Sequence, residues 1–148
     1  MVDNSYDEEL KKKFLKSVNY LFKNDLFLLK NDASERSITH KLAEYLQKEF
    51  PEWHVDCEYN RDLDDVKRRS NDSGFNPDIV VHIRDTDKNL LIIEVKKSNG
   101  IYNDEENRLR EATISKYQYN YQLGIFLTLN VLGEYQKEPI IQFFKNGI

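Results

Sequence analysis

Three charged residues stand near the ends of two apolar segments whose composition predicts strands. Asp78 begins the segment 78–84, and Glu94 and Lys96 lie near the end of the segment 90–96. Side chains alternate between the two faces of a strand, so Glu94 and Lys96 point to the same face. A short polar turn joins the segments and predicts a hairpin. Burying such charges is costly unless they pair or hold a metal ion.

The register of this hairpin decides how close the charges come. If Arg84 pairs with Leu90, Asp78 lies opposite Lys96 and diagonal to Glu94. Any other register that keeps the alternation of side chains also collects the three charges on one face.

Two interpretations of this cluster are open. The first is an ion pair at the end of a sheet, between Lys96 and either carboxylate, which is common and inexpensive when exposed. The second is a divalent metal site, with Asp78 and Glu94 as hard oxygen ligands. Lys96 would then stabilise charge or position a water molecule. Magnesium is usually bound by one or two protein carboxylates, so two are sufficient.

The surrounding pattern predicts an α/β domain with a mixed sheet. Apolar residues at helical spacing predict helices over residues 6–22, 34–50 and 104–117. Apolar runs and alternation predict strands over residues 53–59, 78–84, 90–96, 124–130 and 140–145. The third helix is expected to be a crossover between two strands, which makes part of the sheet parallel.

The motif within this pattern resembles that of the PD-(D/E)XK nuclease superfamily, the restriction-endonuclease-like enzymes. Pro77-Asp78 is followed by fifteen residues and then by Glu94-Val95-Lys96. The core of that family runs helix, three strands, helix, strand, and residues 34–129 follow the same predicted order. The resemblance implies one domain over residues 1–148, with a helical extension over residues 1–32 and an additional C-terminal strand.

The resemblance also implies hydrolysis of phosphodiester bonds in nucleic acid, with DNA as the expected substrate and magnesium or manganese as the cofactor. Asp78, Glu94 and Lys96 would be the catalytic residues, and the two carboxylates would bind the metal. A non-catalytic nucleic-acid-binding module, or a protein-interaction subunit of a restriction or defence system, are the alternatives. The intact acidic pair and lysine favour the enzyme. The net charge of −4 favours the interaction subunit.

Glu35 is a further candidate for the metal site. It falls on the apolar face of the second predicted helix, with Ile38, Leu42 and Leu46. One interpretation gives it a place in a capping box with Asp32 and in the helix dipole. The other gives it to the metal, because many members of the superfamily carry an acidic ligand on the corresponding helix.

The candidates for nucleic-acid contacts are basic residues near these segments. Lys67, Arg68 and Arg69 form a dense basic run in the polar loop before Asp78, which would place them at the border of the site. A solvated loop is the alternative. Lys116 falls on the apolar face of the third predicted helix, so it either faces the site or extends to water.

Composition restricts the cellular setting. Cys57 is the only cysteine among 148 residues, which excludes an internal disulfide and a cysteine-based zinc site. No run approaches the roughly 18 apolar residues of a membrane span. The charged N-terminus is not typical of a signal peptide. These features predict a cytoplasmic protein without a membrane partner.

A homodimer is the predicted assembly. One site of this type cuts one strand, so concerted cutting of a duplex needs two copies. Six apolar residues are concentrated in the segment 21–29, which is a candidate interface. The alternative is that this segment folds back over the open face of the sheet.

The loop prediction is tested by the salt dependence of binding. Each phosphate contact contributes a slope of about −0.9 to log affinity against log salt for duplex DNA. Replacing Lys67, Arg68 and Arg69 together with glutamine is expected to flatten the slope by roughly 2 to 3 units. The same replacement of the basic run at residues 11–13 is the control. An unchanged slope in the loop variant would exclude the loop from the contact.

Overall fold

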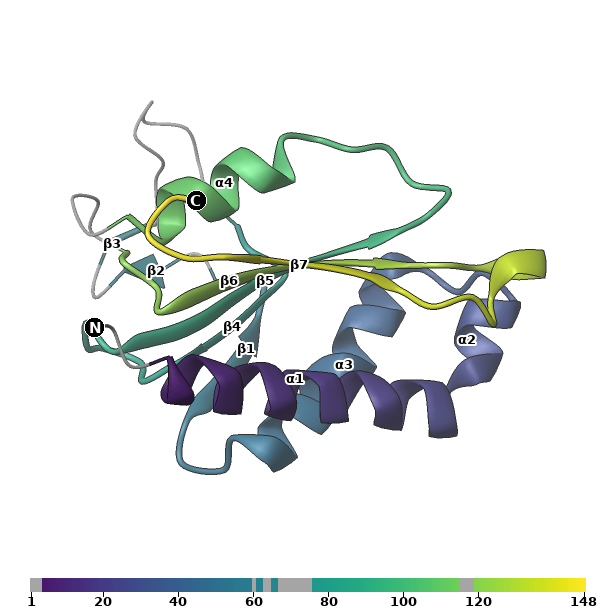
Figure 1. Cartoon of the computed structure of the whole chain (residues 1–148), viewed down its shortest axis with the longest axis horizontal. Coiled ribbons are helices and arrows are strands. Elements are labelled where there is room, and N and C mark those ends of the chain that lie inside the picture. Colours follow the sequence, from purple (N-terminus) through teal and green to yellow (C-terminus); the bar gives the residue numbers. More distant parts are fainter. Residues whose placement is uncertain (1–3, 60, 63–64, 67–75, 115–118) are drawn as a thin grey trace.

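Five strands form one mixed sheet in a computed structural model that describes residues 4–59, 61–62, 65–66, 76–114 and 119–148 (Figure 1). Their order is β1-β4-β5-β6-β7. Their bounds are β1 His54–Cys57, β4 Ile79–His82, β5 Asn89–Lys97, β6 Leu123–Leu129 and β7 Ile140–Phe144. Only β5 and β6 are parallel within this sheet, and its other neighbours are antiparallel. The short strands β2 (Arg61–Asp62) and β3 (Asp65–Val66) pair separately.

Helices cover both faces of the sheet. The helices are α1 Ser5–Asn24, α2 Leu26–Lys30, α3 Glu35–Glu49 and α4 Glu105–Ala112, with the 3-10 turn η1 at Leu132–Glu134. Figure 1 shows α1 and α3 below the sheet and α4 above it, on the connection between β5 and β6. The predicted mixed sheet flanked by helices is confirmed. No helix in the described part of the chain is long and apolar enough to cross a membrane.

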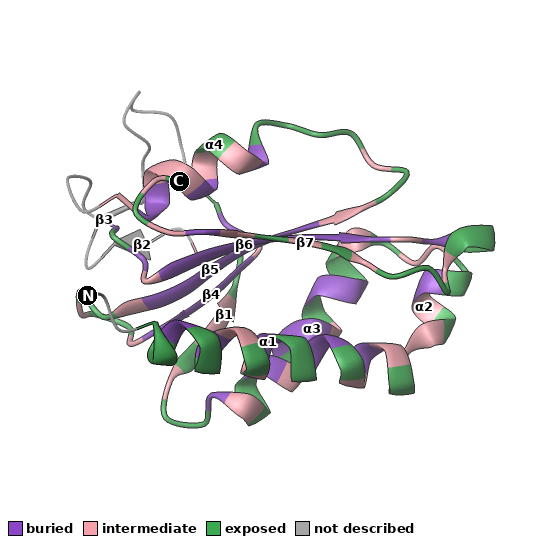
Figure 2. Cartoon of the chain, viewed as in Figure 1, coloured by how far each residue is buried: buried purple, intermediate pink, exposed green. Residues whose placement is uncertain are grey.

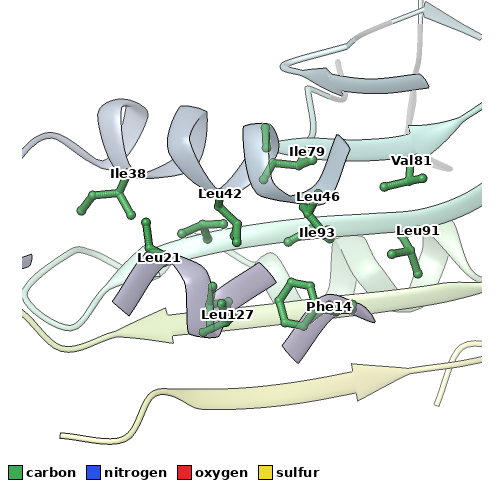
Figure 3. Packing of buried hydrophobic residues seen from close by; sticks show 14 of the residues in the cluster. Phe14, Leu21, Ile38, Leu42, Leu46, Ile79, Val81, Leu91, Ile93 and Leu127 are labelled. Atoms are coloured by element: carbon green, nitrogen blue, oxygen red, sulfur yellow. The ribbon is translucent and has the colours of Figure 1, made fainter. Parts of the chain in front are cut away.

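The alternation of side chains along the central strands divides the core into two clusters. Odd-numbered residues of β4 and β5, such as Ile79, Val81 and Ile93, pack against α1 and α3 (Figure 3). Even-numbered residues, such as Val80 and Ile92, pack with α4 on the other face. Buried positions therefore run continuously along the central strands in Figure 2, while the outer helix faces are exposed. This alternation places Glu94 on the α4 side.

The predicted register of the hairpin is wrong, although its alternation holds. Ile79 pairs with Ile93, and a bulge after Val81 brings His82 opposite Asn89. β4 ends at His82, so the predicted pairing of Arg84 with Leu90 does not form. Extending the observed register by one residue places Asp78 beside Glu94 rather than opposite Lys96. The aspartate is therefore closer to the glutamate than the sequence alone predicted.

The apolar segment 21–29 belongs to the core. Leu21 and Leu29 are fully buried, and Phe22, Leu26 and Leu28 pack against the same cluster as α1 and α3. Among the six apolar residues of this segment, only Phe27 is largely exposed, at 72%. The prediction of an exposed apolar interface is wrong, because α2 turns the segment back toward the core. The homodimer itself stays a prediction without that surface.

Asp7 ties the first turn of α1 to the far end of the sheet. It is buried, and its carboxylate accepts hydrogen bonds from Nε2 of Gln122 at 2.9 Å and from the Lys145 ammonium. Gln122 precedes β6 and Lys145 follows β7, so one carboxylate fixes the helix to two neighbouring strands. Burial raises the pKa of Asp7, but the hydrogen bonds from Lys145 and Gln122 outweigh it and lower the pKa below 3.8.

Asp7→Asn is expected to lower the free energy of unfolding by about 2 kcal/mol at pH 7, because hydrogen bonds to a charged group are lost. A carboxyl with a lowered folded-state pKa stabilises above its ordinary pKa of 3.8, and that stability is lost as the pH falls through the folded value. The difference should therefore shrink in acid, as measured by urea unfolding across pH. Glu8→Gln, at an exposed pair with Lys11, is the control. A constant difference at all pH values would contradict this account.

Candidate active site

One cavity collects every residue that the sequence predicted for catalysis and metal binding. Asp78, Glu94, Lys96 and Glu35 line a cavity of about 290 Å³ near the end of β5. Asp78 comes from the segment just before β4, Glu94 and Lys96 from β5, and Glu35 from the first turn of α3. Residues far apart in sequence thus converge because the hairpin and the helix start meet at one end of the sheet.

Asp78 is held by the backbone of the neighbouring strand. Its Oδ2 accepts a hydrogen bond of 2.7 Å from the N–H of Val95. Burial raises the pKa of Asp78, the Val95 bond and Lys96 act against this rise, and the charge of Glu35 adds to it. The side chain is half-buried, with one oxygen engaged by β5. The aspartate is therefore fixed in orientation and destabilised as an anion.

Glu94 is more deeply buried than Lys96, the other charged residue that β5 contributes to the cavity. It is 3% exposed, and its Oε1 lies 3.3 Å from Nε of Arg108 on α4. Burial raises the pKa of Glu94 well above its ordinary value, and the nearby Asp78 adds to the rise, while Arg108 opposes it. Two neighbouring carboxyls with raised pKa values are the electrostatic condition that a bound cation relieves.

Lys96 makes its ion pairs with residues other than those expected. Its Nζ lies 3.2 Å from Oε1 of Glu105 and 3.8 Å from Oε1 of Glu35. The ion-pair interpretation of the sequence placed Lys96 against Asp78 or Glu94, and that choice of partners is wrong. Both observed partners come from helices that the hairpin pattern does not include.

Glu105 is a buried carboxylate that anchors the lysine. It is 3% exposed, and both of its oxygens accept the backbone N–H of Asn103, at 2.9 and 2.7 Å. Burial raises the pKa of Glu105, but these N–H groups and Lys96 outweigh it and lower the pKa. Glu105 therefore remains an anion that holds the ammonium of Lys96 at the cavity wall.

Glu35 reaches the site and does not complete a capping box with Asp32. Ser34 is the N-cap of α3, and its Oγ accepts from the N–H of Ser37 at 3.1 Å. Glu35 instead accepts the N–H of Lys97 at 3.2 Å through Oε2. Asp32 pairs with Nζ of Lys97 at 2.9 Å. Glu35 lines the cavity with its other oxygen 3.8 Å from Nζ of Lys96, and its role as a metal ligand stays a prediction.

The chemistry of the donor set fits a metal site with two carboxylates. Asp78 and Glu94 present hard carboxylate oxygens to one cavity, and magnesium often takes no more than two carboxylates from a protein. Among the described residues, no group of three or more His, Cys, Asp or Glu side chains is arranged to hold a metal ion. A third ligand from Glu35 would therefore require that side chain to leave Lys96 and Lys97.

Two site residues, Glu105 and Arg108, escaped the sequence analysis. Both line the cavity. Glu105 lies one turn before Leu109 on the buried face of α4, which is the same signal that drew attention to Glu35. Arg108 follows Glu105 by three residues, so the two lie on neighbouring positions of the helix surface. A charged residue on the buried helix face could thus have been noticed. Nothing in the sequence indicated, however, that α4 and the hairpin line the same cavity.

The structure does not test the predicted nucleic-acid contacts. Lys67, Arg68, Arg69 and Lys116 are outside the described residues, so their assignment stays a prediction.

Comparison with known proteins gives no relative. No family model matches the chain, and neither a curated protein nor a solved structure is significantly similar to it.

Asp78→Asn is expected to stabilise the protein without added metal. The variant keeps an oxygen that accepts the Val95 N–H but removes the charge that burial disfavours. Because the folded-state pKa of Asp78 is raised, the charge costs stability as the pH rises above 3.8 and nothing well below it. The unfolding midpoint should rise on the order of 3 °C at pH 7, equivalent to about 1 kcal/mol, and should match the wild type in strong acid.

Asp87→Asn provides the matched control, since Asp87 is exposed in the turn of the same hairpin. Its midpoint should stay within about 1 °C of the wild type at both pH values. A fall in the midpoint of Asp78→Asn at pH 7 would show that the carboxylate stabilises the fold.

Proposed function

We propose that the chain is a metal-dependent nuclease that hydrolyses phosphodiester bonds of nucleic acid, with DNA as the first candidate substrate. The observation that carries this proposal is the convergence of Asp78, Glu94 and Lys96 on one cavity. The order of helix, three main-sheet strands, helix and strand from α3 to β6 supports it, because Asp78 directly precedes β4 and Glu94 and Lys96 lie in β5, as the resemblance implies.

Magnesium or manganese would be held by Asp78 and Glu94. The metal supplies a Lewis acid and lowers the pKa of a bound water molecule. The chain contributes the orientation of the ligands, since Val95 fixes one carboxylate through its N–H and the sheet buries the other. It also contributes the partial exclusion of bulk water, because Glu94 lies beneath α4.

Lys96 is the catalytic cation in this proposal. Its ammonium lies at the cavity wall between Glu105 and Glu35. An ammonium in this place would donate hydrogen bonds to a water molecule or to a phosphate oxygen, and would stabilise negative charge that develops during attack. Glu105 acts as a positioning residue, because its fixed carboxylate limits the directions in which the lysine can point.

One observation favours a non-catalytic nucleic-acid-binding or protein-interaction module with the same fold. The cavity charges are already paired within the chain, Glu94 with Arg108 and Lys96 with Glu105. A cluster whose role is structural would have this balance. The two functions differ in whether a metal is bound and whether a substrate is cut.

The proposal is tested by incubating the full chain with supercoiled, linear, single-stranded and branched DNA, and with RNA, in magnesium, manganese or EDTA. Cleavage is expected with either metal and not in EDTA. Asp78→Ala and Glu94→Ala should lower the rate at least about 10²- to 10³-fold, the range found when a group that stabilises developing charge is removed. Lys96→Ala should lose cleavage and keep metal binding in calorimetry, since an ammonium is not a ligand.

Glu106→Ala is the control for these variants. Glu106 lies on α4 beside the site residues but pairs with Arg110 at 3.5 Å. It should cut at the wild-type rate. Wild-type rates in both carboxylate variants would end the nuclease proposal, and binding of nucleic acid without cleavage would favour the non-catalytic module. Direct linearisation of the supercoiled circle would support the homodimer, whereas a nicked circle alone would oppose it.

A further inference from the structure

Arg108 occupies the side of Glu94 that faces the cavity. Its Nε lies 3.3 Å from Oε1 of Glu94, its Nη1 donates to the carbonyl of Asn103 at 2.5 Å, and its Nη2 lies 4.0 Å from Oε1 of Glu105. The guanidinium therefore bridges a strand carboxylate, a loop carbonyl and a helix carboxylate. Arg108 and its three partners all line the cavity.

Glu94 needs a cation because it is buried. An ionised carboxylate that is 3% exposed is strongly destabilised unless it is paired. Lys96 is engaged by Glu105 and Glu35. Within the described residues, the ion pair of Glu94 is with Arg108. The guanidinium therefore supplies the positive charge that the buried carboxylate requires.

We infer that Arg108 is the internal counter-ion of the proposed metal site, and that a divalent metal binds by displacing it from Glu94. This inference rests on the proposed function. A metal bound to Glu94 would compete with the guanidinium for the charge of the same carboxylate, and the two cations would repel each other, so each weakens the binding of the other. The side chain of Arg108 is 23% exposed, whereas that of Glu94 is 4% exposed. The arginine is thus the partner with an open path away from the contact.

This arrangement couples metal affinity to the stability of the metal-free chain. While Arg108 holds Glu94, part of the metal's binding free energy is used to break the contact. Removing the guanidinium leaves the buried carboxylate of Glu94 without this ion pair when no metal is present. The same carboxylate is then free to bind a metal without first breaking a contact. Loss of Arg108 should therefore weaken the metal-free fold and strengthen metal binding. A residue that only supports the shape of the site would weaken both.

The test is calorimetric titration of the full chain with manganese and with magnesium, in the wild type and in Arg108→Gln. The variant is expected to bind either metal about 5- to 50-fold more tightly, which lies within the range typical of coupling between two binding events. Its unfolding midpoint should be lower than that of the wild type in EDTA, and the rise on adding metal should be larger.

Arg110→Gln is the matched control. Arg110 lies on the same helix and pairs with Glu106 at 3.5 Å, outside the cavity that Arg108 lines. The substitution removes the same charge two residues away, so it reports the long-range electrostatic effect alone. Its metal affinity should change less than about 2-fold, because exposed charges are screened by salt.

The outcomes separate the inference from the proposed function. Wild-type metal binding with equal or weaker binding in Arg108→Gln overturns the inference and leaves the nuclease proposal standing. Absence of metal binding in both proteins overturns both. If Arg108→Gln does not fold in EDTA, recovery of its circular dichroism spectrum on adding manganese supports the inference. Failure to recover overturns it, provided that the wild type binds manganese.

Discussion

The pleat of β5 is the constraint on which the rest of the molecule depends. This strand lies between β4 and β6 and is covered by helices on both faces, so every side chain along its middle enters one of two cores. Ile93 and Val95 lie two positions apart, so both point to the face of the sheet that α1 and α3 cover. Glu94 enters the α4 side because it lies between them. A charge is therefore buried as a direct result of strand geometry, and neighbouring elements compensate it.

The compensation comes from backbone groups and from α4. Val95 donates its N–H to Asp78, so the residue next to the buried glutamate also orients the second carboxylate. Helix α4 then provides one charge of each sign, since Arg108 meets Glu94 and Glu105 meets Lys96. These crossed pairs give Glu94 and Lys96 of β5 an oppositely charged partner each at the cavity. The same ion pairs hold Glu94 and Lys96, and the proposed reaction needs both side chains free to contact a metal or a substrate.

Much of this architecture was predictable from local patterns, and the parts that failed depend on tertiary contacts. Alternation in the hairpin correctly collected Asp78, Glu94 and Lys96 at one cavity, because parity survives an error of two residues in the register. The register itself was wrong, because the turn is tighter than predicted: β4 ends at His82, which pairs with Asn89, whereas the prediction paired Arg84 with Leu90. The helical period placed Glu35 on the buried face of its helix, and this residue does line the cavity. The partners of Lys96 were missed because α3 and α4 approach the strand from distant parts of the chain.

The distance between α4 and the sheet therefore decides whether the site exists at all. Gly124 in β6 allows this approach, because a Cβ there would lie 3.3 Å from Cγ2 of Thr113 and 3.5 Å from Cβ of Leu109. The contact with Thr113 is tighter than ordinary packing and the contact with Leu109 is ordinary, so a methyl group here requires a shift of a few tenths of an ångström and a larger side chain requires more. Arg108 lies next to Leu109 on that helix, and its contact with Glu94 is 3.3 Å. A shift of about 1 Å would exceed the reach of that contact. The glycine in β6 thus helps α4 to lie close enough for Arg108 to pair with Glu94 of β5.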